Sequence, residues 1–154
     1  MAASQLLCAL MQLSFLGAGE TSYASAYHQA TETGKPMLVL IGADWCPHCV
    51  TMKNSVMPQV EQAGLLQQVS YVSLNSDRHP QLAGQMMRGR SVPQLLVYYR
   101  TGSGWRMRHI TGSTSSGNVN SIIRQALDAV AADPPAGSST VPVSDTKPIS
   151  TSAN

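Results

Sequence analysis

Apolar residues change their spacing several times along the chain, and each change marks a predicted helix or strand. Residues 37–41 are apolar without interruption, which fits a strand buried on both faces. Residues 69–74 alternate between two faces like a second strand, whereas 119–131 repeats apolar side chains at the spacing of an amphipathic helix. The full prediction, in chain order, is a helix ending at Gly34, the strand at 37–41, a helix opening at Pro47, the strand at 69–74, a helix at 80–87 closed by Gly89, a hairpin of 94–100 and 105–111, and the helix at 119–131.

The order of strand, helix and strand over residues 37–74 is a βαβ unit. A right-handed crossover places its two strands parallel in one sheet. The chain then passes through Val92-Pro93 into the hairpin and turns at 101–104. We therefore predict an α/β domain.

The two ends of the chain differ from this central part. Residues 6–18 are almost wholly apolar, a length that suits a signal peptide and falls short of the roughly 20 residues of a membrane-spanning helix. Residues 133–154 are rich in Pro, Ser and Thr, as disordered segments are. We expect a signal peptide at 1–19, a domain at 20–132, a disordered tail at 133–154, and an exported protein that is periplasmic or secreted.

Two features leave alternatives open at the N-terminus. No Lys or Arg precedes Lys35, so the basic region of a signal peptide is missing, and an uncleaved first helix in a cytoplasmic protein is the alternative. Small residues allow cleavage after Gly19 or after Ala26. We favour Gly19, because a cut after Ala26 removes one end of the first predicted helix.

Composition excludes several classes of protein. The chain has 154 residues, which suits one domain, and its 12% charged and 43% hydrophobic residues fit neither a highly charged disordered chain nor a polytopic membrane protein. A net charge of +2 is too small to indicate nucleic-acid binding, and we expect none. Three cysteines cannot form a disulfide framework, so any disulfide is local and functional.

Two of these cysteines belong to Trp45-Cys46-Pro47-His48-Cys49, which joins the buried strand to the next helix. Together with Val92-Pro93 at the head of the hairpin and Gly112 near its end, this motif resembles the thioredoxin fold and its active site over about residues 21–131. The resemblance implies an α/β thioredoxin-like fold with a central mixed β-sheet flanked by helices. The Pro47-His48 dipeptide is similar to that of DsbA-type disulfide oxidases, but the chain lacks room for their inserted helical domain.

The resemblance, together with position, predicts the chemistry of the cysteines. If Pro47 is the first helical residue, Cys46 lies at a helix N-terminus, where unpaired N–H groups and the helix dipole favour a sulfur anion. We expect an exposed Cys46 with a lowered pKa as the nucleophile, and Cys49, one turn further on, as the resolving thiol. His48 adds positive charge beside the thiolate. The alternative for His48 is an exposed spacer without effect.

Other residues are assigned by the same resemblance. Pro93 is similar to the cis-proline that faces the cysteine pair in this fold, and Trp45 and Val92 would line the substrate groove beside it. Thioredoxins carry a buried acid six residues before the first cysteine, but Leu40 stands there. Asp44 is expected to be an exposed turn residue and not a substitute. A fast general reductase is therefore not expected.

Seven arginines and no acidic residue lie between Arg78 and Gln125. Arg88 and Arg90 lead into the Pro93 loop, and we hypothesise that they stabilise the Cys46 thiolate or steer acidic partners toward it. The alternative is that both belong to a solvated face.

We weighed binding functions against redox chemistry. Cys46, His48 and Cys49 offer metal ligands, but the remaining histidines are not at paired spacing, so no metal is expected. Val50 stands where c-type haem attachment requires His, which excludes haem. We therefore predict a monomeric thiol-disulfide oxidoreductase with no cofactor beyond its Cys46–Cys49 disulfide, and its direction, as an oxidase or isomerase or as a reductase, stays open. Its partners would be protein thiols or disulfides and a membrane or soluble redox protein, and the alternative is a thioredoxin-fold binding module without redox turnover.

Overall fold

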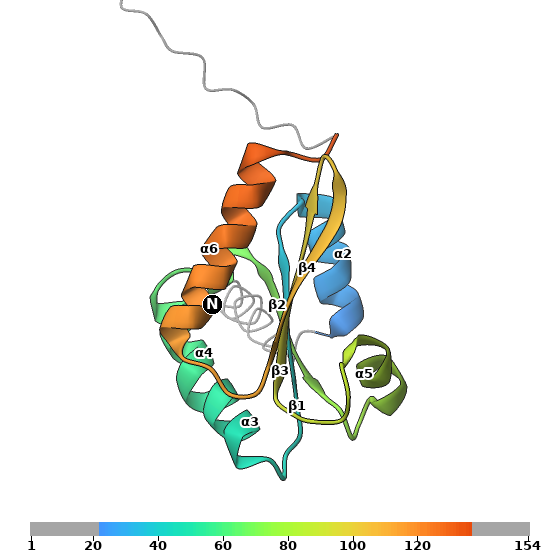
Figure 1. The fold of residues 1–154 in the computed structure, drawn as a ribbon, viewed down its shortest axis with the longest axis vertical. Coiled ribbons are helices and arrows are strands. Elements are labelled where there is room, and N and C mark those ends of the chain that lie inside the picture. Colours follow the sequence, from blue (N-terminus) through green and yellow to red (C-terminus); the bar gives the residue numbers. More distant parts are fainter. Residues whose placement is uncertain (1–21, 137–154) are drawn as a thin grey trace, which may run out of the picture.

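The computed structural model describes residues 22–136, which form a four-stranded sheet with helices on both faces (Figure 1). The elements are α2 (Tyr23–Thr33), β1 (Met37–Gly42), α3 (Pro47–Thr51), η2 (Met52–Val56), α4 (Met57–Gln62), η3 (Leu66–Gln68), β2 (Ser70–Asn75), α5 (Pro80–Met86), β3 (Gln94–Thr101), β4 (Gly104–Thr111) and α6 (Ser116–Ala132). Every helix and strand predicted from the sequence is present.

The sheet has the strand order β2-β1-β3-β4 and is mixed. β1 runs parallel to β2 and antiparallel to β3, and β3 and β4 form the predicted antiparallel hairpin. α3, α4 and α6 cover one face of the sheet, and α2 and α5 lie on the other (Figure 1). The predicted α/β fold with a mixed central sheet is therefore confirmed.

The uninterrupted apolar run of β1 serves two separate core clusters. Leu38 and Leu40 pack in the cluster that includes α4 and α6, whereas Val39 and Ile41 pack in the cluster that includes α2. Successive side chains of a strand point to opposite faces of the sheet, so a strand covered on both faces must be apolar at every position. This burial fixes the end of β1, where the cysteine motif begins.

One predicted helix cap and one predicted helix start were wrong. α5 ends at Met86 with Met87 in extended conformation, so Gly89 does not cap the helix, although its φ of 72° lies in the left-handed region. α6 begins three residues earlier than predicted, because Ser115 caps it by accepting a hydrogen bond from the Asn118 N–H. A polar first turn has no apolar spacing to reveal it.

The residues that follow α6 contact the turn between β3 and β4. The Asp133 carboxylate accepts hydrogen bonds from the N–H and the hydroxyl of Ser103, at 2.9 and 2.8 Å, and these bonds lower the pKa of Asp133. Pro135 is buried. The end of α6 is thereby tied to the β3–β4 turn. The predicted signal peptide with Cys8, and the rest of the predicted tail, lie outside the described residues.

Candidate active site

The Cys46–Cys49 pair lies where β1 ends and α3 begins. The two sulfurs form a disulfide, and the Cα atoms are 5.2 Å apart. Pro47 is the first residue of α3, which makes Cys46 the N-cap residue, and its Sγ accepts a hydrogen bond from the Cys49 N–H at 3.2 Å. A backbone donor of the first helical turn thus points at the sulfur, as the sequence predicted.

Burial of Cys46 corrects one expectation. We expected Cys46 to be exposed, but only 4% of its surface is accessible, and 6% of that of Cys49. Ala43 and Val92 pack against the pair, and the Val92 carbonyl oxygen lies 3.8 Å from the Cys46 Sγ. The residue that covers Cys46 thus comes from a loop more than forty positions further along the chain, which a local pattern does not reveal.

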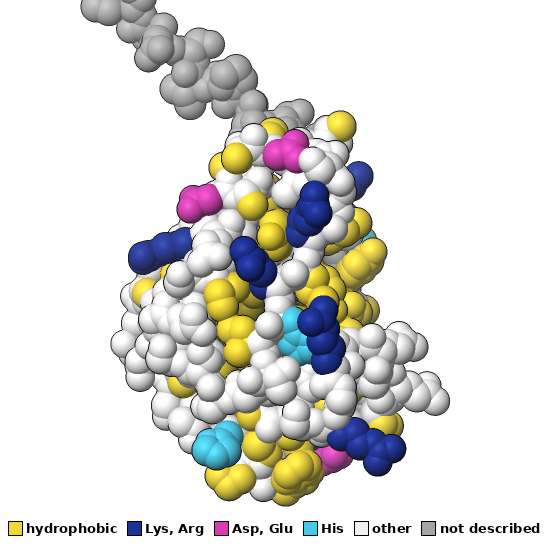
Figure 2. Space-filling view, in the orientation of Figure 1, with side chains coloured by type: hydrophobic (Ala, Val, Ile, Leu, Met, Phe, Trp, Pro, Cys, Tyr) yellow, Lys and Arg dark blue, Asp and Glu magenta, His cyan; other side chains and the backbone are white. Residues whose placement is uncertain are grey.

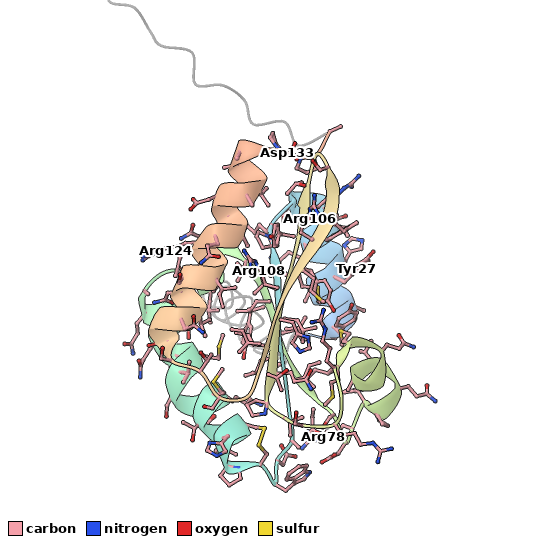
Figure 3. All side chains as sticks on the ribbon, in the orientation of Figure 1. Tyr27, Arg78, Arg106, Arg108, Arg124 and Asp133 are labelled. Atoms are coloured by element: carbon pink, nitrogen blue, oxygen red, sulfur yellow. A yellow bond between two sulfur atoms is a disulfide. The ribbon has the colours of Figure 1, made fainter. Side chains whose placement is uncertain are left out.

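Exposed hydrophobic side chains flank the buried disulfide, next to exposed polar residues. Trp45 is 69% exposed and Val50 is 43% exposed, and both flank the cysteines in the sequence. Figure 2 shows hydrophobic side chains at the end of the molecule where Figure 3 shows the disulfide. Pro47 and His48 are exposed as well. Trp45 and Val50 therefore form a hydrophobic rim beside the disulfide.

The loop that carries Trp45 is held by the loop that follows β2. The Trp45 indole N–H donates to the Asp77 carboxylate at 2.9 Å, and Asp44 forms an exposed ion pair with Arg78 at 3.0 Å. Asn75 accepts the backbone N–H groups of Asp77 and Arg78 and so shapes that loop. Asp44 is the exposed turn residue that the sequence predicted. The contribution of Asp77 was missed, because nothing in its local sequence marks it.

The Val92–Pro93 peptide bond is cis, as the resemblance implied. Pro93 is buried, and its carbonyl accepts the Gly112 N–H at 2.8 Å, so the residues flanking the hairpin meet. Through Val92 this loop contacts the Cys46 sulfur. The structure therefore places the Val92–Pro93 peptide beside the Cys46–Cys49 pair, while Trp45 adjoins Cys46 in the sequence and contacts Asp77.

Arg88 and Arg90 are exposed, and within residues 22–136 no hydrogen bond or ion pair joins either of them to Cys46. The Arg88 guanidinium acts instead on His109, whose pKa is lowered by burial and by this positive charge. Arg106, Arg108 and Arg124 lie over β4 and α6, away from the disulfide (Figure 3). Arg78 lies nearer, in a cleft that Cys49 also lines, and the predicted effect of Arg88 and Arg90 on the thiolate stays a prediction.

The helix that follows the cysteines is irregular for a reason visible in the sequence. Pro58 has no N–H and its ring clashes with the carbonyl four residues earlier, so a regular helix cannot pass through it. The structure inserts the π-helical turn η2, in which the Met57 N–H donates to the Met52 carbonyl. The turn lets the helical segment continue into α4. Pro58 marks this irregular turn in the sequence, but the sequence prediction did not use it.

Behind Cys49, β1 approaches the helix very closely at Gly42. A Cβ atom at Gly42 would lie 2.9 Å from the Cys49 Cβ and 3.3 Å from its Sγ. A cleft of about 110 Å³ opens on the same side, lined by residues that include Leu40, Cys49 and Ser73. Leu40 is buried in the core, so no carboxylate stands at this position beside Cys49. The role of Gly42 was not predicted.

The described part of the chain offers neither a metal cluster nor a membrane-spanning helix. Between residues 22 and 136 there is no cluster of three His, Cys, Asp or Glu side chains that could hold a metal ion. In the same part of the chain, the helices are too short or too polar to cross a bilayer.

Comparison with known proteins agrees with this geometry. A family model described as thioredoxin-like matches residues 18–99. No curated protein matches the chain in sequence. Among solved structures, chloroplastic thioredoxin z is similar, with a TM-score of 0.58 and 18% identity over 70% of this chain and 91% of that one. A Thermus thermophilus thioredoxin has a TM-score of 0.58 and 21% identity, over 68% of this chain and 83% of that one. At such identities the solved structures show the fold alone. The family model, in contrast, covers more than half of the chain, and the chain therefore belongs to the thioredoxin-like family.

Proposed function

We propose that the protein is a thiol-disulfide oxidoreductase that exchanges disulfides with partner proteins, with Cys46 attacking and Cys49 resolving. The observation that carries the proposal is the disulfide at the first turn of a helix, where the Cys49 N–H donates to the Cys46 sulfur. Such a donor binds a sulfur anion more strongly than a neutral sulfur. The arrangement therefore favours a nucleophilic Cys46 thiolate once the disulfide is reduced.

The proposed exchange has two steps. The Cys46 thiolate attacks one sulfur of a substrate disulfide, forms a mixed disulfide and releases the other substrate sulfur, which takes up a proton. Cys49 then loses its proton and attacks the Cys46 sulfur, which closes the Cys46–Cys49 disulfide and releases the second substrate thiolate. The protein loses two electrons and the substrate gains them. The same steps in reverse transfer a disulfide to a substrate dithiol.

The surroundings of each sulfur suit a slow or selective exchanger. Cys46 is covered by Val92, so a substrate sulfur must enter between this loop and the rim formed by Trp45. Cys49 has no carboxylate at Leu40 to take its proton, and Asp44, which lines the adjacent cleft, is ion-paired with Arg78. Water or the departing substrate thiolate would then take the proton. Both features disfavour a fast general reductase.

The reduction potential of the Cys46–Cys49 pair tests the proposal and its direction. The full-length protein would be equilibrated against glutathione or dithiothreitol, and its thiols counted by alkylation and mass. We expect a reversible two-electron couple. A potential of about −120 mV would mean that the protein donates disulfides, as Pro47-His48 suggests. A potential of about −270 mV would mean that it is a reductase. If the pair shows no reversible couple, the redox proposal is wrong and the binding-module alternative replaces it.

We also propose that the protein acts outside the cytoplasm, after removal of residues 1–19. The apolar run at 6–18 supports export. Cleavage after Gly19 leaves α2 intact, whereas cleavage after Ala26 would remove its first residues. Ala26 is fully buried, and its carbonyl accepts the Ser70 hydroxyl at 2.7 Å, so a cut after Ala26 would damage the core. We expect the mature protein to begin at Glu20. A mass corresponding to an intact chain or to a start at Tyr27 would contradict this.

A further inference from the structure

Gln94 is a polar side chain buried without any exposed surface, directly after Pro93 at the start of β3. Residues 87–93, which carry Val92 to the disulfide, lie between α5 and β3 and belong to no helix or strand. Among the described residues, no backbone group of 88–92 pairs with another backbone group. Something else must hold this loop against Cys46.

The Gln94 amide supplies that support, and it uses all four of its hydrogen-bonding positions. Its Nε2 donates to the carbonyl oxygens of Arg88 and Ser91, at 3.1 and 2.6 Å. Its Oε1 accepts the Arg88 N–H at 3.0 Å and lies 2.7 Å from the His109 Nε2. The two carbonyls fix the orientation of the amide, since only its NH₂ group can donate to them.

This orientation also fixes the proton on His109. The Gln94 Oε1 can only accept, so the His109 Nε2 must carry the hydrogen between them. The other ring nitrogen, Nδ1, is buried without a partner in the described part of the chain. A second proton there would be an unpaired buried donor close to Arg88, which agrees with the lowered pKa of His109. Neutral His109 thus holds Gln94 from β4, while Gln94 holds the loop.

We propose that Gln94 is a positioning residue for disulfide exchange: it holds the 88–93 loop so that Val92 stands beside the Cys46 sulfur, and His109 secures it. This inference rests on the proposed function. A partner chain must fit against Val92 to bring its sulfur to Cys46, so a displaced loop misplaces the partner. A small dithiol needs no such fit. Losing Gln94 should therefore affect exchange with a peptide far more than exchange with dithiothreitol.

The test compares two rate constants in the full-length protein. One is for reduction of the Cys46–Cys49 disulfide by dithiothreitol, and the other is for reduction of a disulfide-bonded peptide by the reduced protein. Gln94→Met keeps the size of the side chain and removes its four hydrogen bonds. Gln85→Met makes the same change at an exposed position of α5 and serves as the matched control. The peptide-to-dithiothreitol ratio should fall about tenfold in Gln94→Met and stay unchanged in Gln85→Met.

A second variant guards against loss of folding. His109→Phe keeps the three bonds from Gln94 to the loop and removes only the bond from β4, so the ratio should fall by about threefold. If Gln94→Met does not fold, the ratio measured in His109→Phe tests the inference in its place. An unchanged ratio in a folded Gln94→Met, or in His109→Phe when the first is unfolded, overturns the inference alone. A wild-type protein inert toward both reagents overturns the proposed function, and the inference with it.

Discussion

Replacing Cys49 by alanine should stop the proposed exchange after its first step, with the substrate left covalently bound to Cys46. Cys46 keeps its place as N-cap, and position 49 keeps the N–H that donates to sulfur, so the thiolate should still attack a substrate disulfide. Without the Cys49 thiol the mixed disulfide has no internal route to resolution. We expect one equivalent of peptide thiol to be released, no further turnover, and a covalent adduct of protein and peptide visible by mass.

Cys46→Ala is the matched comparison and should give no adduct and no turnover. The two cysteines are almost equally buried, but Cys49 lacks the N-cap position, where a backbone N–H and the helix dipole favour a thiolate at Cys46. Both variants are best made together with Cys8→Ser, so that no third thiol contributes. Turnover in Cys46→Ala equal to that of the parent would contradict the assigned roles. Adduct formation by Cys46→Ala, with none by Cys49→Ala, would also contradict them and would make Cys49 the attacking and Cys46 the resolving cysteine.

The parts of the fold predicted from sequence are those that depend on neighbouring residues. The apolar run of β1 and the alternation in β2 reflect which faces are covered, and a strand shows this directly in its sequence. The helix start at Pro47 follows from the fixed φ and the missing N–H of proline. Because Cys46 directly precedes Pro47, its cap position was predictable as well.

What was missed depends on segments that meet only in the folded chain. The cover over Cys46 comes from Val92, and the support of that loop comes from Gln94 and His109. No periodicity connects these residues. One signal was present: Gln94 is a polar residue directly before the apolar residues of β3, where a buried amide must find partners. Its partners could not have been named without the loop geometry.

Gly42→Ala should destabilise the protein although the substitution adds a single methyl group. The new Cβ would lie 2.9 Å from the Cys49 Cβ, an atom bonded directly to the backbone of α3 that cannot rotate away. β1 is fixed by its pairing with β2 and β3, so the strand and the helix must separate. Overpacking of this kind typically costs about 1–3 kcal/mol. Urea unfolding of the oxidised and the reduced protein should both show the loss, because the contact involves Cβ as well as sulfur.

Gly84→Ala is the matched control, because it makes the same chemical change at a position with free space. Gly84 lies within α5, and a Cβ there would meet nothing within 4 Å. Alanine in a helix is favoured over glycine by about 0.5–1 kcal/mol, so this variant should be slightly more stable than the parent. The same chemical change should therefore move the free energy of unfolding in opposite directions at the two sites. Equal effects would mean that the close approach of β1 to Cys49 does not limit the side chain at position 42. A loss confined to Gly42→Ala would show that this contact limits how closely a side chain on β1 can approach the helix that carries the disulfide.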